Sequence, residues 1–254
     1  MVKFTLRSVP VLLALCALCS CSDPVKPGST AKDPQSAYDE AKALLDNGSY
    51  ESAITAYEQL EARFPYGRQA QQGQLDTAYA HYRLRDTEST VADCDRFIRL
   101  HPNHPNVDYA YYLKALAYEN TKADDWFEFL PQQPLSERDA QAVSNAFETF
   151  KIIVTRYPQS RYTPSSREHL EKLLEALATH ELNAARYYMK RRAPLAAVNR
   201  AQNVIRKYST SKGTEEALAL MVQGYDTMHL DTLRDDTERV LRASYPDSRF
   251  LAKK

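Results

Sequence analysis

The chain has 254 residues, of which 43% are hydrophobic, and it contains only six glycines. Because strand-like alternation is also lacking, this composition favours one elongated helical array over a globe built on a single core. Lysine plus arginine and aspartate plus glutamate both number 33, so the net charge argues neither for nor against nucleic acid. Three of the four cysteines lie within the first 21 residues, which excludes a disulfide framework in the remainder, where Cys94 stands alone.

Residues 1–20 have the pattern of a bacterial signal peptide, with Lys3 and Arg7 before an apolar stretch too short to span a bilayer. Residues 18–21, Leu-Cys-Ser-Cys, resemble a lipobox, in which a small residue precedes the cysteine that is lipidated. We therefore predict that Cys21 is the lipidated first residue of the mature chain and that residues 21–32 form a flexible tether. An ordinary secretory signal peptide is the alternative.

The first repeat, residues 33–65, has the pattern of a helical hairpin. Asp33-Pro34 predicts an N-cap followed by proline in the first turn, and Asn47-Gly48 predicts the end of the first helix. An apolar stripe at i, i+4, i+7 and i+11 predicts a second helix that ends before Pro65. The stripe consists of Ala53, Tyr57, Leu60 and Phe64. One hairpin cannot bury its apolar face alone, so neighbouring hairpins must stack.

The second helix of this hairpin defines a skeleton that recurs four more times. Each copy has a closing position, an aromatic ring or histidine one residue before it, and a large apolar residue five before it. The closing residues are Pro65, Pro102, Pro158, Ser209 and Pro246. A small residue recurs twelve before the closing position, and only Arg234 breaks this rule. The small residues are Ala53, Thr90, Ala146 and Ala197.

The second repeat ends in a segment that carries two histidines three residues apart, His101 and His104. This spacing could suggest a metal site, but the two prolines of the segment favour a turn, with Asn106 as the N-cap of the next helix. The apolar stripes of this repeat are Leu75, Ala78, Tyr79 and Tyr82 in the first helix and Val91, Cys94, Phe97 and Ile98 in the second.

The third repeat is lengthened by an insert near residues 122–136, which contains Trp126 and Phe127. An insert this apolar is either a plug that folds back on its own repeat or a docking surface. Ser136 is predicted to start the following helix, with Asp139 as its capping-box partner. The stripe of that helix is Ala142, Val143, Ala146, Phe150 and Ile153.

The last two repeats follow the same plan. Thr163-Pro164 predicts a cap and a helix start, and no glycine or proline interrupts the sequence until about Lys190, so this helix should bridge the two halves of the molecule. The fifth repeat should start at Thr214 and turn near Asp231. We therefore predict an all-α solenoid of about five hairpins, with N-terminal repeats over residues 33–158 and C-terminal repeats over residues 159–254.

Charge is unevenly distributed near the C-terminal repeats. No acidic residue lies between Glu181 and Glu215, while eight basic residues do, among them Arg191, Arg192 and Arg200. This favours an oriented protein contact over nucleic acid, although cations near residue 190 also complement a helix C-terminus. The sequence contains no phosphate-binding glycine loop, zinc-protease motif or nucleophile elbow, and nothing in it indicates an enzyme.

Several motifs resemble the BamD family of outer-membrane assembly lipoproteins, also called ComL or YfiO, which consists of tetratricopeptide repeats. The resemblance covers essentially the whole mature chain, and only the insert beyond Trp126-Phe127 matches poorly. The matching segments are Arg63-Phe-Pro-Tyr-Gly67, Gln74-Leu-Asp76, residues 95–102, residues 104–109 and Val198-Asn-Arg200.

The resemblance implies a lipid-anchored scaffold on the periplasmic face of the outer membrane, without a cofactor. Such a protein binds the POTRA portion of BamA through its C-terminal repeats, docks the accessory lipoproteins BamC and BamE, and receives unfolded outer-membrane proteins. Stacked hairpins provide an elongated groove that suits peptides and protein edges. A lipoprotein scaffold for cell-wall or DNA-uptake machinery is the alternative, and no nucleic-acid partner is expected.

Two groups of residues are candidates for these contacts. The match at Val198-Asn-Arg200 places the BamA contact at Asn199, Arg200, Arg191 and Arg192. Arg200 flanks the buried stripe of its helix and should be unpaired, unless Glu175 or Glu216 reaches it from a neighbouring helix. The resemblance also suggests an aromatic-ended substrate peptide at one end of the groove. The residues there are Phe64, Tyr66, Tyr79 and Tyr82, of which Phe64 and Tyr79 could equally be packing residues.

Overall fold

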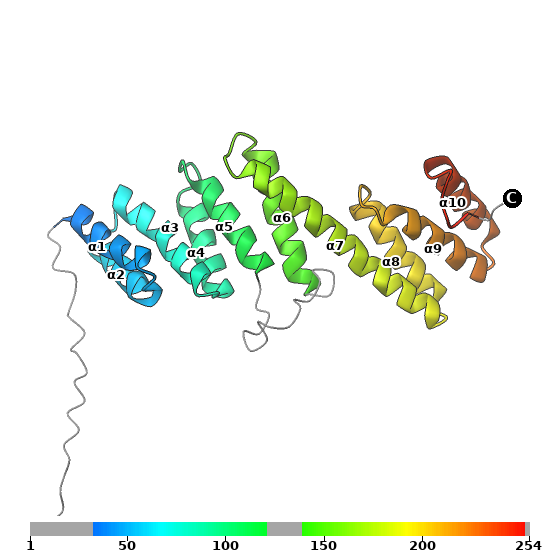
Figure 1. The fold of residues 1–254 in the computed structure, drawn as a ribbon, viewed down its shortest axis with the longest axis horizontal. Coiled ribbons are helices and arrows are strands. Elements are labelled where there is room, and N and C mark those ends of the chain that lie inside the picture. Colours follow the sequence, from blue (N-terminus) through cyan, green and yellow to red (C-terminus); the bar gives the residue numbers. More distant parts are fainter. Residues whose placement is uncertain (1–32, 121–138, 252–254) are drawn as a thin grey trace, which may run out of the picture.

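The computed structural model describes residues 33–120 and 139–251 of the chain. Within these ranges it contains ten helices and no strand (Figure 1). In chain order the helices are α1 (Pro34–Asp46), α2 (Tyr50–Arg63), α3 (Arg68–Arg83), α4 (Thr87–Leu100), α5 (Val107–Glu119), α6 (Ala140–Arg156), α7 (Thr163–Lys190), α8 (Pro194–Lys207), α9 (Thr214–Thr227) and α10 (Asp231–Ser244).

Consecutive helices pack against each other from α1 to α10, so the chain forms one elongated row (Figure 1). The helices pair into five hairpins, which confirms the predicted all-α solenoid. α7 has 28 residues, which corresponds to about 42 Å. It packs against α6 and α8 and also reaches α9, as the predicted bridging helix should. Among the described helices, none combines the length and hydropathy needed to cross a bilayer.

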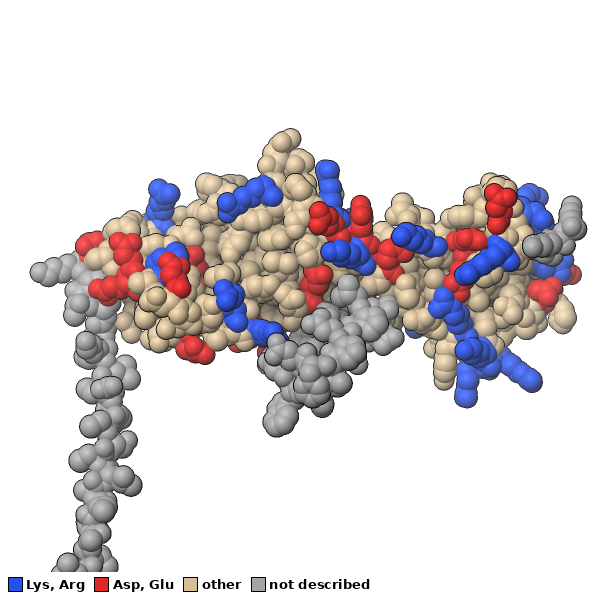
Figure 2. Space-filling model, in the orientation of Figure 1, with Lys and Arg blue, Asp and Glu red and all other residues tan. Residues whose placement is uncertain are grey.

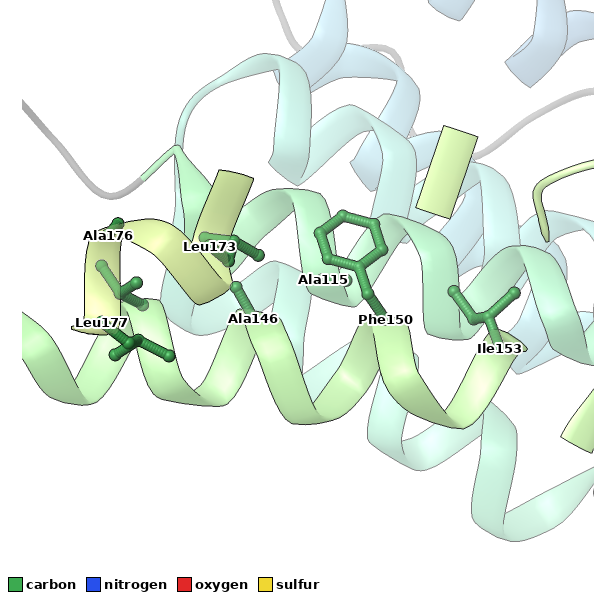
Figure 3. Close-up of a cluster of buried hydrophobic side chains, with 8 residues drawn as sticks. Ala115, Ala146, Phe150, Ile153, Leu173, Ala176 and Leu177 are labelled. Carbon is green, nitrogen blue, oxygen red and sulfur yellow. The ribbon is translucent and has the colours of Figure 1, made fainter. Parts of the chain in front are cut away.

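The buried residues confirm the repeat skeleton. The small residues twelve before the closing position are completely buried, so the helices approach closely there. The large apolar residues five before the closing position are buried in all five copies. Figure 3 shows one cluster, in which Phe150 of α6 lies near Ala115 of α5, and Ala146 of α6 lies near Leu173 of α7. α10 is the exception, because Arg234 replaces the small residue and only Leu241 is buried.

The turn within a hairpin has one backbone design in four of the repeats. Two residues after the end of the first helix lies a residue with a left-handed conformation, whose N–H donates to the carbonyl three residues back. The next N–H donates five residues back, as in a Schellman motif. The four left-handed residues are Gly48, Arg85, Arg192 and His229. Only Gly48 could be predicted, because the other three residues do not favour this conformation.

The connection between repeats also recurs. The backbone carbonyl of Tyr157 accepts from the N–H of Ser160, and the backbone carbonyl of Ser160 accepts from the N–H of Thr163. The same two backbone hydrogen bonds connect Tyr208, Ser211 and Thr214. The prediction that Thr163 caps α7 is wrong. Thr163 is inside the helix, and its hydroxyl donates to the carbonyl of Tyr157 at 2.8 Å.

The predicted N-caps of the other helices agree with the structure only in part. Asp33 caps α1 as predicted, accepting from the N–H groups of Gln35 and Ser36 at 3.0 Å. Asn106 precedes α5, but its side chain makes no capping bond. Asp139 is itself the N-cap of α6, accepting from Gln141 N–H at 2.9 Å, rather than a capping-box partner. Ser136, Trp126, Phe127 and Cys21 lie outside the described residues.

Candidate functional site

Arg200 lies on the flank of α8, between its buried stripe and solvent. The buried residues of α8 are Ala197, Val198, Ala201 and Val204. Val198 is buried beside Ala197, the small residue of this repeat, whereas Tyr208, which precedes the closing Ser209, is only partly buried. The side chain of Arg200 is 41% exposed, and Asn199 is exposed beside it. Both residues are therefore accessible to a partner, as the sequence predicted.

The expectation that Arg200 is unpaired is wrong. Its Nη1 lies 3.4 Å from Oε1 and 3.5 Å from Oε2 of Glu181 on α7. Asn203 donates to the same carboxylate at 3.1 Å. Glu181 was not among the predicted partners, although it is the acidic residue that precedes the basic stretch. Both contacts of Arg200 are long and use one nitrogen, so they lack the bidentate geometry of a strong arginine–carboxylate ion pair.

The two predicted partners have other roles. Glu216 accepts from both Nε and Nη2 of Arg186 at 2.6 Å, and this pairing lowers the pKa of Glu216 and raises that of Arg186. Glu175 accepts from the backbone N–H of Lys212 at 3.0 Å. The basic stretch is therefore partly neutralised by acids from outside it, which sequence distance alone could not reveal.

A second exposed group lies at the turn between α7 and α8. Lys190, Arg191 and Arg192 are all exposed there. Figure 2 shows basic side chains projecting at the lower edge of the molecule, where α7 turns into α8 in Figure 1. Arg200 lies six residues after Pro194, the first residue of α8, which is about 9 Å along this helix. One partner could therefore contact both groups.

The structure does not bring the four candidate aromatic residues together. Tyr79 and Tyr82 lie near the end of α3, with ring centroids 6.5 Å apart. Tyr82 accepts a hydrogen bond from Asn120 at 2.7 Å, and burial raises the pKa of its hydroxyl. Phe64 and Tyr66 lie before the start of α3, about 20 Å from Tyr79 along the helix. Phe64 packs on the first core cluster, whereas Tyr66 is 90% exposed.

The two histidines of the second repeat pack around an aromatic ring. The rings of His101 and His104 both lie 5.1 Å from that of Phe97, and His101 contacts the side-chain amide of Gln74 at 3.1 Å. No group of three potential ligands is placed to hold a metal in the described residues. Burial raises the pKa of the Cys94 thiol, which lies in the core of this repeat.

Comparison with known proteins decides the family. The YfiO family, described as "Outer membrane lipoprotein", matches residues 30–241. The chain belongs to this family. The protein named outer membrane protein assembly factor BamD from Neisseria meningitidis serogroup B is 43% identical over 84% of this chain and 80% of its own length. The BamD of Neisseria gonorrhoeae is 39% identical over 98% of this chain and 94% of its length.

More distant relatives carry the same name. The BamD of Xylella fastidiosa strain 9a5c is 34% identical over 84% of this chain and 73% of its length. A solved kinesin light chain from Podosopora anserina with TPR-like repeats has a TM-score of 0.37 at 14% identity, covering 86% of this chain and all of that one. The family match and the BamD relatives confirm the resemblance found in the sequence motifs.

Proposed function

We propose that this family member is a lipid-anchored scaffold on the periplasmic face of the outer membrane that assists the assembly of β-barrel proteins. In this role it binds BamA and unfolded outer-membrane proteins, together with BamC and BamE where these are present. Membership of a family whose relatives are named outer membrane protein assembly factors supports the proposal. The observation that carries the partner surface is the accessible and weakly paired Arg200 on α8.

The chemistry at Arg200 suits an incoming carboxylate. Glu181 makes only long contacts to Nη1 of Arg200, so a partner carboxylate can bind the guanidinium in a bidentate geometry. Asn203 keeps a hydrogen bond to Glu181, which limits the cost of loosening the internal pair. Arg191, Arg192 and Asn199 then extend the contact along one edge of the C-terminal repeats.

Substrate contact is assigned to two separate places. Tyr66 is the exposed ring of the first repeats and can stack on an aromatic residue of an extended peptide. Tyr79 and Tyr82 form a pair of rings about 20 Å away, so one peptide in extended conformation would need about six residues to reach both. Trp126 and Phe127 remain candidates for docking an accessory lipoprotein.

Affinity purification from membranes tests the function. The full chain and its Cys21→Ala variant are purified in mild detergent, and co-purifying proteins are identified by mass spectrometry. We expect BamA with the wild type, and loss of the variant from the membrane fraction, because acyl chains provide the attachment. Recovery of cell-wall or DNA-uptake proteins without BamA would favour the alternative scaffold and contradict the proposal.

A further inference from the structure

A cleft lies between the second helices of the first two repeats. The first helices α1 and α3 pack against each other, and so do α3 and α5, whereas no extensive packing joins α2 and α4 in the described part of the chain. The cleft between α2 and α4 has a volume of about 70 Å³ and is partly open to solvent. Carboxylates from both helices line it, namely Glu58 and Glu61 of α2 and Asp93 of α4.

One carboxylate oxygen in this cleft accepts no hydrogen bond. Oδ2 of Asp93 is buried and receives no hydrogen bond within the described residues. Nε2 of His81 on α3 lies 3.7 Å away, within reach of an ion pair when the imidazole is protonated but beyond hydrogen-bonding distance. Burial raises the pKa of Asp93, and Glu58 and Glu61 add to that effect, while His81 and Arg96 oppose it. A buried carboxylate without a donor is costly, so it gains strongly from a cation that reaches it.

The other cation in the cleft is already engaged. Arg96 of α4 forms an ion pair with Glu61 across the opening. That leaves Glu58, which is exposed, and Asp93, whose side chain is 26% exposed, facing the open part of the cleft. The open part therefore has a net negative charge, even when His81 is protonated.

Asp93 and Arg200 occupy the same position of the repeat. Each lies nine residues before its closing residue, Pro102 or Ser209, and each contacts the first helix of its own hairpin, through His81 or Glu181. The other three repeats have an uncharged residue at this position, namely Ala56, Thr149 and Thr237. The same position of the repeat thus holds an acid in the second repeat and a base in the fourth.

We infer that the Asp93 cleft is a second docking point for the protein that binds at Arg200, and that it receives a lysine or arginine side chain of that partner. The inference rests on the proposed function of Arg200. A partner that spans both positions would place a carboxylate on Arg200 and a cation between Asp93 and Glu58. Two opposite charges in one register fix the direction in which the partner lies along the solenoid.

Binding of the POTRA region of BamA from the same bacterium to the full chain in detergent tests the inference. The variants are Asp93→Asn, which keeps the shape and removes the charge, and Arg200→Ala. The control is Glu171→Gln, which removes a charge from an exposed position on α7. We expect binding of Asp93→Asn to weaken by at least about tenfold, and that of Glu171→Gln to stay within about twofold of wild type.

The outcomes separate the two claims. Wild-type affinity of Asp93→Asn together with weak binding of Arg200→Ala would overturn the docking point and leave the proposed function intact. Wild-type affinity of both variants would overturn the docking point and also the assignment of Arg200 to the partner surface, whereas absence of wild-type binding would contradict the proposed function itself. A second variant, Asp93→Lys, should bind more weakly still and recover when one POTRA lysine or arginine is changed to glutamate. Failure of every such reversal to restore binding would also overturn the inference.

Discussion

Asp76 of α3 shows how one residue joins the first two repeats. Its Oδ2 accepts from the hydroxyls of Tyr38 at 2.7 Å and Tyr57 at 3.1 Å, and its Oδ1 accepts from the amide of Gln72 at 2.9 Å. The sequence singled out Asp76 only as part of a family motif. Its structural role depends on three helices that meet, which no local pattern could reveal.

Asp76→Ala should therefore destabilise the protein. The variant leaves two partly buried tyrosine hydroxyls without their charged acceptor, and hydrogen bonds to charged groups each contribute about 1.5–3 kcal/mol. We expect the free energy of unfolding to fall by about 3–6 kcal/mol in denaturant titration. Asp39→Ala removes an exposed carboxylate on α1 and should change it by less than about 0.5 kcal/mol. Equal losses in both variants would contradict this role.

Asp93 should make stability depend on pH in an unusual direction. Burial raises the pKa of its carboxyl above the ordinary value of 3.8, so the folded state binds its proton more tightly than the unfolded state. Its contribution to stability is complete below pH 3.8 and is lost as the pH rises through the raised pKa. Asp93→Asn should then be at least as stable as wild type at pH 7, and this advantage should shrink in acid. Denaturant titrations at pH 3.5 and 7 check it.

The positions of the helices could be predicted from the sequence, but their termini could be predicted only in part. The apolar stripes located α2, α3, α4 and α6, because burial of one face determines a helix more strongly than local propensity, and the other helices were placed from caps, turns and the repeat skeleton. The termini depend on single residues that tolerate unusual conformations. Arg85, Arg192 and His229 are left-handed although none is glycine, because the hydrogen bonds of the turn compensate the strain.

His229→Gly should stabilise the last hairpin. His229 is exposed and has φ 56°, a conformation that glycine adopts at no steric cost. Relief of a left-handed conformation is worth about 1 kcal/mol, so we expect a rise of about 0.5–1 kcal/mol in the free energy of unfolding. Glu171→Gly, inside α7, should instead cost about 1 kcal/mol. A destabilised His229→Gly variant would contradict the assigned conformation.

The last helix of the array, α10, is weakly packed. α10 buries only Leu241, whereas α7 buries eight residues and connects the two halves. Arg234, the residue that breaks the small-residue rule, pairs with Asp226, Asp231 and Asp235. Pairing between Arg200 and Glu181 could not be foreseen, because it depends on how α7 and α8 are aligned.

Hydrogen exchange should follow this gradient of packing. Amides of α10 should exchange at least about tenfold faster than those in the middle of α7, since local opening exposes few buried contacts there. Mass spectrometry of peptic fragments measures both helices in one sample. Uniform protection along the array would show that it unfolds as one unit and would contradict the gradient.

The dissociation constant between the full chain and the POTRA region of BamA, measured for wild type and for Arg200→Ala, shows whether the surface at Arg200 binds the partner. Arg206→Ala, which removes an exposed arginine at the far end of α8, is the matched control. We predict that Arg200→Ala loses about 2 kcal/mol of binding, or about thirtyfold in affinity, with an unchanged thermal melting curve. Equal dissociation constants for wild type and Arg200→Ala would contradict the assignment of this surface to the partner.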